Sequence, residues 1–220
     1  MPLHLFLLKR FHSILGIFPL SFFLVVHFLN YSTALLPQGV LEYNKIFQTP
    51  ALFQNILLFV FVYFPLLFHS FYGLVLLKKT KHNALTYSHF QNILFTLHHI
   101  TAFLSLGFIL FHIYELKINP TCAEGARDYL CFVSYFQAWW KVGIYILGVT
   151  SVFFHFCYGA WNFLVDWGIL ISQKGRKIFL GIFFTLFFFL SFTSIVVIFK
   201  MVYHYKQAPW IIEIILNFFK

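Results

Sequence analysis

The sequence predicts an all-α protein that crosses a membrane five times. Of its 220 residues, 61% are hydrophobic and only 10% are charged, whereas a soluble domain carries about 25% charged residues. The apolar residues form runs of about twenty, the length that an α-helix needs to cross the hydrocarbon core of a bilayer. The formal net charge of +9 is gathered in the connectors, where topology and anionic lipids account for it. We therefore expect a lipid bilayer as surroundings, no sizeable water-soluble domain and no nucleic-acid binding.

Charged and helix-breaking residues bound the first four helices. The first apolar run follows Lys9 and Arg10 and ends at Pro37; it is too long for a signal peptide, so we expect it to be retained. The second contains Pro65, which neighbouring helices can accommodate in a membrane. Tryptophans lie towards both ends of the fourth, as in an interfacial aromatic belt. The predicted spans are 11–36, 51–77, 92–116 and 138–166.

A fifth apolar run, 178–203, completes one transmembrane domain over residues 1–204. Residues 205–220 are too short to span, and we expect them to lie at the membrane interface. Eight of the fifteen Lys and Arg residues fall on the side that holds the N-terminus. The positive-inside rule therefore favours a cytoplasmic N-terminus, and five spans place the C-terminus on the outer side.

Four histidines stand inside apolar runs, one in each of the first four predicted helices: His27, His69, His112 and His155. A titratable side chain inside a membrane is costly and usually has a function. One such histidine could be a packing residue, a proton relay or a metal ligand. One in each of four helices makes coincidence a poor explanation.

The constant rise of an α-helix, about 1.5 Å per residue, places these histidines in two layers. Counted from the basic-side end of its helix, His27 lies 17 residues deep and His112 lies 21 deep. His69 lies nine deep and His155 eleven. We call His69 and His155 the basic-side pair and His27 and His112 the far-side pair. The two layers are about 10–15 Å apart in depth.

Two pairs of imidazoles on facing helices are the ligands that two haems would need. A neutral imidazole can ligate iron without burying a charge. Small residues recur near these ligands. Gly73 and Gly159 follow the basic-side pair by four residues, and Gly16 and Thr101 precede the far-side pair by eleven. Each lies on the ligand face of its helix, so we expect all four to pack against the flat macrocycles.

These stretches resemble the cytochrome b membrane-anchor subunits of succinate dehydrogenase and fumarate reductase, of the single-chain type with five helices and two haems. The resemblance lies in KRFHSILGIFPL, YFPLLFHSFYG, FHIYE and FHFCYGAWNFLVDWGI, within residues 9–198, with all four histidines in register. It implies two haems b, a proximal one on His69 and His155 and a distal one on His27 and His112. It also implies a flavoprotein subunit with FAD, an iron–sulfur subunit, a quinone (typically menaquinone) and the cytoplasmic membrane of a bacterium. This chain would then carry electrons and would not itself oxidise succinate.

Other polar residues are candidates for supporting roles. By the motif, contacts with the haem propionates could come from Arg10, His12, Ser13 and His99. Family members often have an arginine at the position of His99, and histidine is cationic only when protonated. At the far side, proton exchange with the quinone could involve Glu115, Glu42, Tyr31 and Tyr43, which could equally be ordinary interfacial residues.

Two other functions stay open on the sequence alone. A dihaem cytochrome that serves a different dehydrogenase would bind the same haems but different partners. A haem-free transporter or proton channel could use the histidines as a relay, although a relay gives no reason for two layers. The absence of C-x-x-C motifs from the sequence argues against a zinc site or covalently attached haem. Cys122 and Cys131 share one loop and would form a disulfide if it faced an oxidising compartment.

Overall fold

The chain is helical almost throughout the part that the structure describes. The computed structural model describes residues 3–35, 51–80, 89–115, 136 and 138–218, without the side chains of 51–54 and 204–218. The α-helices are α1 (Leu3–Leu15), α2 (Ser21–Ser32), α4 (Ala51–Leu58), α5 (Phe64–Lys79), α6 (Phe90–Ile113), α8 (Trp139–Asp166) and α9 (Gln173–Phe218). Two wider π-type turns, η1 (Gly16–Leu20) and η3 (Phe59–Tyr63), join α1 to α2 and α4 to α5, and the short 3-10 turn η2 (Thr33–Leu35) ends α2.

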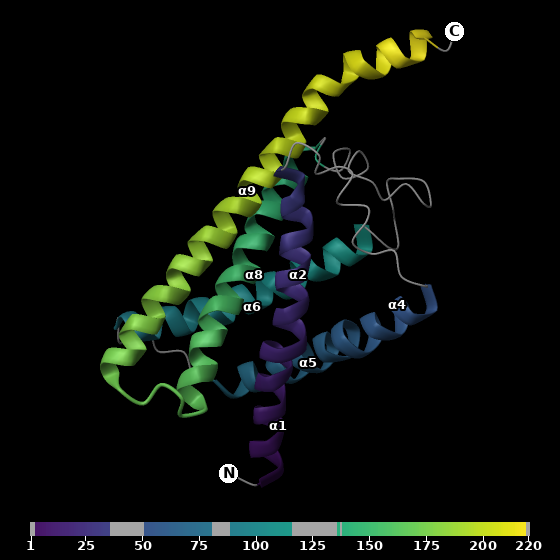
Figure 1. Cartoon of the computed structure of the whole chain (residues 1–220). Coiled ribbons are helices and arrows are strands. Elements are labelled where there is room, and N and C mark those ends of the chain that lie inside the picture. Colours follow the sequence, from purple (N-terminus) through teal and green to yellow (C-terminus); the bar gives the residue numbers. More distant parts are fainter. Residues whose placement is uncertain (1–2, 36–50, 81–88, 116–135, 137, 219–220) are drawn as a thin grey trace.

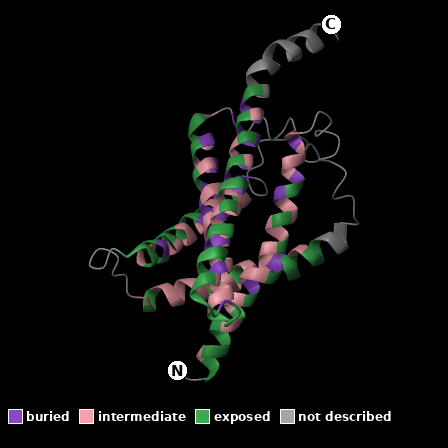
Figure 2. Ribbon diagram, turned by 60° about the vertical axis from the view of Figure 1, so that its left-hand side comes forward, coloured by how far each residue is buried: buried purple, intermediate pink, exposed green. Residues whose placement is uncertain are grey.

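Five helical segments are long and apolar enough to cross a membrane. They are Leu3–Leu35, Asn55–Lys79, Phe90–Ile113, Trp139–Asp166 and Gln173–Tyr203. The predicted fold class, all-α with five spans, is therefore confirmed. Many large apolar side chains are exposed, among them Phe188, Phe189 and Phe192 of α9, which are 61–69% exposed. Exposed positions recur along the helices (Figure 2). A bilayer would cover such a surface.

The first and last helices are longer than predicted. The first begins at Leu3 instead of residue 11, because the sequence from Leu3 to Leu15 contains no proline or glycine to interrupt it. α9 begins at Gln173 and continues beyond Tyr203 to Phe218. The side chains of residues 204–220 lie outside the described part, so the interfacial location of 205–220 stays a prediction.

Both π-type turns accompany a proline in a spanning segment. Pro19 lies inside η1, and Pro65 follows η3 by two residues at the start of α5. Proline has no N–H to donate and its ring collides with the preceding turn, so a regular α-helix cannot continue unchanged through it. The Ser21 hydroxyl donates to the Gly16 carbonyl (2.7 Å). It thereby satisfies one backbone acceptor within this irregular turn.

The helix α8 packs against both α6 and α9, and α2 runs beside it (Figure 1). In both views α5 and α6 cross the direction of α2 and α8 steeply (Figures 1 and 2). α1 packs against α5. These contacts place the histidine-bearing segments of α2, α5, α6 and α8 around one interior.

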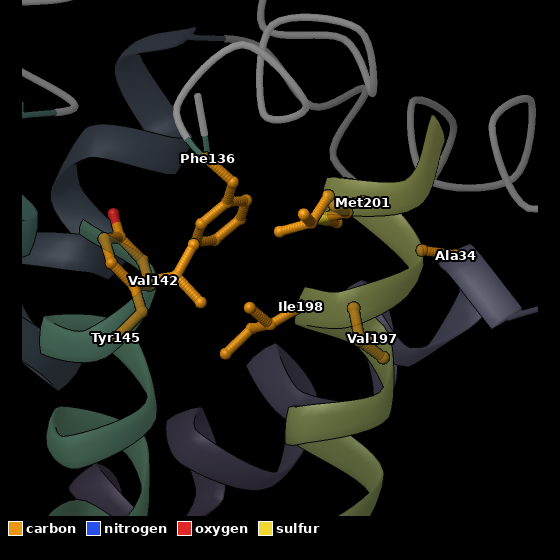
Figure 3. Packing of buried hydrophobic residues seen from close by; sticks show 8 residues of the cluster. Ala34, Phe136, Val142, Tyr145, Val197, Ile198 and Met201 are labelled. Atoms are coloured by element: carbon orange, nitrogen blue, oxygen red, sulfur yellow. The ribbon is translucent and has the colours of Figure 1, made fainter. Parts of the chain in front are cut away.

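Buried apolar side chains join α8 to α9 at the far side. Phe136 and Val142 lie opposite Ile198 and Met201, with their side chains in the space between the two helices (Figure 3), and Tyr145 packs against Phe136. Ala34 from the end of the first span completes this cluster. At the opposite end Tyr158 and Trp161 of α8 pack with Leu170 and Leu180. α9 therefore holds α8 in place along its length.

Close approach between α6 and α8 depends on Gly148. A Cβ atom there would lie 2.1 Å from Cγ of Phe108, which is far inside van der Waals contact. We predict that Gly148→Ala displaces Phe108 and lowers the free energy of unfolding by about 1–3 kcal/mol. Denaturant titration in detergent, followed by circular dichroism, measures this change.

Gly143→Ala is the matched control on the same helix. A Cβ at Gly143 meets no atom within 4 Å among the described residues, so this change should leave stability unchanged or raise it by about 0.5–1 kcal/mol. Equal loss of stability in both variants would contradict the prediction.

Candidate haem-binding sites

The four intramembrane histidines lie in two facing pairs. His69 of α5 faces His155 of α8, with ring centroids 6.1 Å apart and ring planes at 76°. His27 of α2 faces His112 of α6, also at 6.1 Å, with planes at 68°. The structure thus brings together the same basic-side and far-side pairs that helix depth predicts.

The spacing within each pair fits one iron between two imidazoles. A metal–imidazole bond of about 2 Å on each side puts the two ligating nitrogens about 4 Å apart. Each ring centroid lies a ring radius behind its nitrogen, so centroids at 6.1 Å match such an arrangement. Each pair therefore has the spacing that fits one iron between two imidazoles, with ring planes that are far from parallel in both pairs.

Backbone carbonyls orient both members of the basic-side pair. Nδ1 of His69 lies 3.0 Å from the carbonyl oxygen of His12, and Nδ1 of His155 lies 3.3 Å from that of His98. A carbonyl can only accept, so in each bond Nδ1–H is the donor and Nε2 is left for a metal. In the far-side pair, Nδ1 of His112 is hydrogen-bonded at 3.2 Å to the hydroxyl of Tyr145.

Two further histidines stack on the basic-side pair. The His12 ring lies parallel to that of His69, at 4.0 Å and 8°. The His98 ring lies parallel to that of His155, at 4.3 Å and 7°. The four imidazoles therefore form a row in the order His12, His69, His155, His98. From the sequence, His12 and His98 are candidates for a role near a haem carboxylate at the basic-side ends of their helices, and their stacking on His69 and His155 was not predicted.

The predicted small residues lie against these imidazole rings. A Cβ on Gly16 would lie 2.6 Å from Cε1 of His69, and one on Gly73 would lie 3.2 Å from Cε1 of His12. A Cβ on Gly159 would lie 3.3 Å from Cε1 of His98. The hydroxyl of Thr101 donates to the carbonyls of Leu97 (2.8 Å) and His98 (3.1 Å). The three glycines therefore make room for imidazoles; packing of these residues against macrocycles stays a prediction.

An internal repeat underlies this arrangement. The pattern F-H-x-x-Y-G occurs at residues 68–73 and again at 154–159, 86 residues later. In both halves the stacking histidine precedes the paired one by 57 residues, His12 before His69 and His98 before His155. This repeat is the signal in the sequence that could have identified His98.

The π-type turn η1 accounts for the one departure from the repeat. His27 follows His12 by 15 residues, whereas His112 follows His98 by 14. A π-type turn holds one residue more than the α-helical turn that it replaces, and η1 (Gly16–Leu20) lies between His12 and His27. The extra residue is thereby absorbed, and both far-side histidines reach the same layer.

Three of the candidates for propionate contact lie at the basic side with other neighbours. Arg10 donates to the Asp166 carbonyl (2.8 Å) and its guanidinium lies 4.8 Å from the ring centre of Trp167. Nδ1 of His99 donates to the Phe95 carbonyl of its own helix (2.8 Å). Ser13 is partly buried on α1. Arg10 thus ties the first span to the end of α8.

The far-side candidates include two polar contacts between helices. The Tyr31 hydroxyl is hydrogen-bonded to the Ser194 hydroxyl of α9, and the Tyr31 ring lies 5.9 Å from that of His27. Glu115 is 6% exposed and forms an ion pair of 2.7 Å with Lys141. Glu42 and Tyr43 lie outside the described residues, as do Cys122 and Cys131. The sequence did not indicate Lys141 or Tyr145. They meet Glu115 and His112 only because α8 packs on α6.

Comparison with known proteins identifies the family of the chain. The family model described as succinate dehydrogenase/fumarate reductase transmembrane subunit matches residues 78–198. The chain is also 32% identical over 200 residues to the succinate dehydrogenase cytochrome b558 subunit of Bacillus subtilis (strain 168), covering 90% of this chain and 97% of that protein. The chain therefore belongs to the family of transmembrane subunits of succinate dehydrogenase and fumarate reductase.

Proposed function

We propose that this chain binds two haems b and carries electrons between an iron–sulfur subunit and a membrane quinone. Family membership makes it part of a succinate dehydrogenase or fumarate reductase complex. The observation that carries the proposal is the two histidine pairs, each at 6.1 Å between ring centroids. The relative's name, cytochrome b558 subunit, supports haem b as the group that they hold.

The partners follow from the proposed place in the complex. A flavoprotein subunit with FAD and an iron–sulfur subunit would perform succinate oxidation or fumarate reduction, and this chain is the non-catalytic membrane anchor. We place the basic side and the N-terminus towards the cytoplasm of a bacterium, and the C-terminus on the outer side. The cluster of Lys and Arg residues on the N-terminal side supports this orientation. Menaquinone is the quinone that we propose.

The chain's own residues position the haem ligands and keep them neutral. When bound, the two irons supply one-electron chemistry. The carbonyls of His12 and His98 hold the proton of each basic-side ligand at Nδ1, and Tyr145 contacts Nδ1 of His112. The surrounding apolar helices exclude water from both pairs, which favours the neutral ligand.

Proton exchange with the quinone needs polar groups at the far side. Tyr31 stands beside His27 and is hydrogen-bonded to the buried Ser194. Glu115, three residues beyond His112, forms a largely buried ion pair with Lys141. These groups can hold or pass protons close to the far-side pair.

Loss of one ligand from each pair should remove a different haem. We predict that His69→Ala and His27→Ala complexes each retain one haem b per chain instead of two, with the remaining haem differing in midpoint potential between the variants. Haem quantification and redox-titrated absorption spectra of the purified complexes measure this. His4→Ala, at an exposed position, should keep both haems.

A wild-type complex with no b-type absorption band, or with one haem per chain, would contradict the proposal. Proton flux without any haem would instead favour the channel alternative. Co-purification of a flavoprotein and an iron–sulfur protein separates the proposed complex from a dihaem cytochrome of another dehydrogenase.

Removal of the Tyr31 hydroxyl should slow quinone turnover. We predict that Tyr31→Phe lowers electron transfer from succinate to menaquinone analogues by about 10²-fold, the lower range for loss of a positioned proton donor. Haem content and succinate oxidation with a water-soluble dye should not change. Tyr114→Phe, at a 46% exposed position near the far side, is the control. Equal quinone activity in Tyr31→Phe and the wild type would exclude this role.

A further inference from the structure

Four contacts recur in both halves of the chain around the basic-side pair. They connect each ligand-bearing helix to the histidine that stacks on its ligand. In the first half they join α5 to His12 of α1, and in the second they join α8 to His98 of α6. A contact that occurs once can be an accident of packing; four contacts at equivalent positions in two halves indicate a built arrangement.

The first two contacts act on the ligand itself. The carbonyls of His12 and His98 accept the Nδ1–H of the ligand at 3.0 and 3.3 Å. The rings of the same two residues lie on the ligand imidazole at 4.0 and 4.3 Å, within 8° of parallel. A carbonyl oxygen has two lone pairs, so it can accept this bond in addition to one within its helix. Bond and ring together fix both the tilt and the plane of the ligand.

The other two contacts hold the stacking ring. Tyr72 lies 5.9 Å from the His12 ring, and Tyr158 lies 5.3 Å from the His98 ring, as centroid distances. Gly73 and Gly159 pass beside Cε1 of these rings, leaving no room for a larger residue without displacement. In the repeated pattern H-x-x-Y-G, the histidine is therefore the ligand, and the tyrosine and glycine hold the stacking histidine of the neighbouring helix.

The stacking histidines act through their ring faces. Nδ1 of His12 and Nδ1 of His98 are buried and have no hydrogen-bond partner among the described residues. The described contacts of these rings are with other rings, so a flat apolar ring of similar shape should serve in their place.

The far-side pair has different ring neighbours. His27 faces Phe23 at 5.5 Å and His112 faces Phe108 at 5.7 Å, and each of these phenylalanines lies one turn earlier on the ligand's own helix. A histidine from a second helix that both stacks on the paired imidazole and accepts its Nδ1–H is thus found at the basic-side pair.

We infer that His12 and His98 are positioning residues that fix the ring planes of the basic-side haem ligands, His69 and His155, through a carbonyl bond and a stacked ring. This inference rests on the proposed function, since it concerns the ligands of one of the two haems. A strong bond from Nδ1–H makes an imidazole more electron-donating and stabilises ferric iron. Loss of the stacked ring should weaken this bond and therefore raise the midpoint potential of that haem alone.

The test compares His12→Leu and His98→Leu, which remove the stacked ring, with His12→Phe and His98→Phe, which keep one. Each variant is purified as the full complex. Electron paramagnetic resonance of the oxidised haems reports the angle between the two axial imidazole planes, and redox titration gives each potential. His89→Leu, at an exposed position at the start of α6, is the control.

We expect each leucine variant to change the resonance and raise the potential of the basic-side haem, with the far-side haem unchanged. The phenylalanine variants and His89→Leu should resemble the wild type. Loss of the basic-side haem in a leucine variant, restored by phenylalanine at the same position, would support the inference equally.

Two results would overturn it. One is a leucine variant that binds both haems with an unaltered resonance and potential. The other is loss of both haems in the leucine and phenylalanine variants alike, because the two histidines would then only support the fold. A wild-type complex without haem would instead refute the proposed function, so the two failures are distinguishable.

Discussion

The rest of the structure depends on placing four half-buried imidazoles among apolar helices. In a membrane no bulk water is present to solvate a ring N–H, so a partner within the protein stabilises it. Carbonyls of neighbouring helices serve His69 and His155, and a tyrosine hydroxyl contacts His112. These bonds determine how far α1 slides along α5, and α6 along α8, because a shift of one turn would leave an imidazole without its partner.

A glycine and an irregular helical turn allow the first span to make these contacts. Gly16 allows the first span to pass directly over the His69 ring. The adjacent turn η1 accommodates the extra residue between His12 and His27. These two histidines therefore match His98 and His112 of the regular helix α6. The two halves thus reach the same geometry by different means. Pro19, which lies in η1, distorts the first span between His12 and His27.

Helix depth could be predicted from the sequence, whereas helix rotation could not. The rise per residue is nearly constant, so counting from the basic side assigns His69 with His155 and His27 with His112. Which residue of a neighbouring helix meets a given ring depends on rotation and crossing angle, which a count does not contain. For this reason Gly73 and Gly159 lie against histidines that were not assigned to them, and the contacts of His98 and Tyr145 were missed. The ion pair of Glu115 likewise joins two helices separated by an entire loop.

The two pairs differ in how far a single substitution can alter their surroundings. The basic-side histidines donate to backbone carbonyls, which no substitution removes, so their environment is set by the fold and by the rings stacked on them. At the far side, His112 is hydrogen-bonded to a side-chain hydroxyl, and Tyr31 and the Glu115–Lys141 ion pair lie in the same region. Single substitutions can therefore alter the polarity around the far-side pair while leaving the backbone intact. Under the proposed function, such freedom suits the far side, where the quinone would be accommodated, and the fixed carbonyls suit the basic side, where electrons would be exchanged with the iron–sulfur subunit.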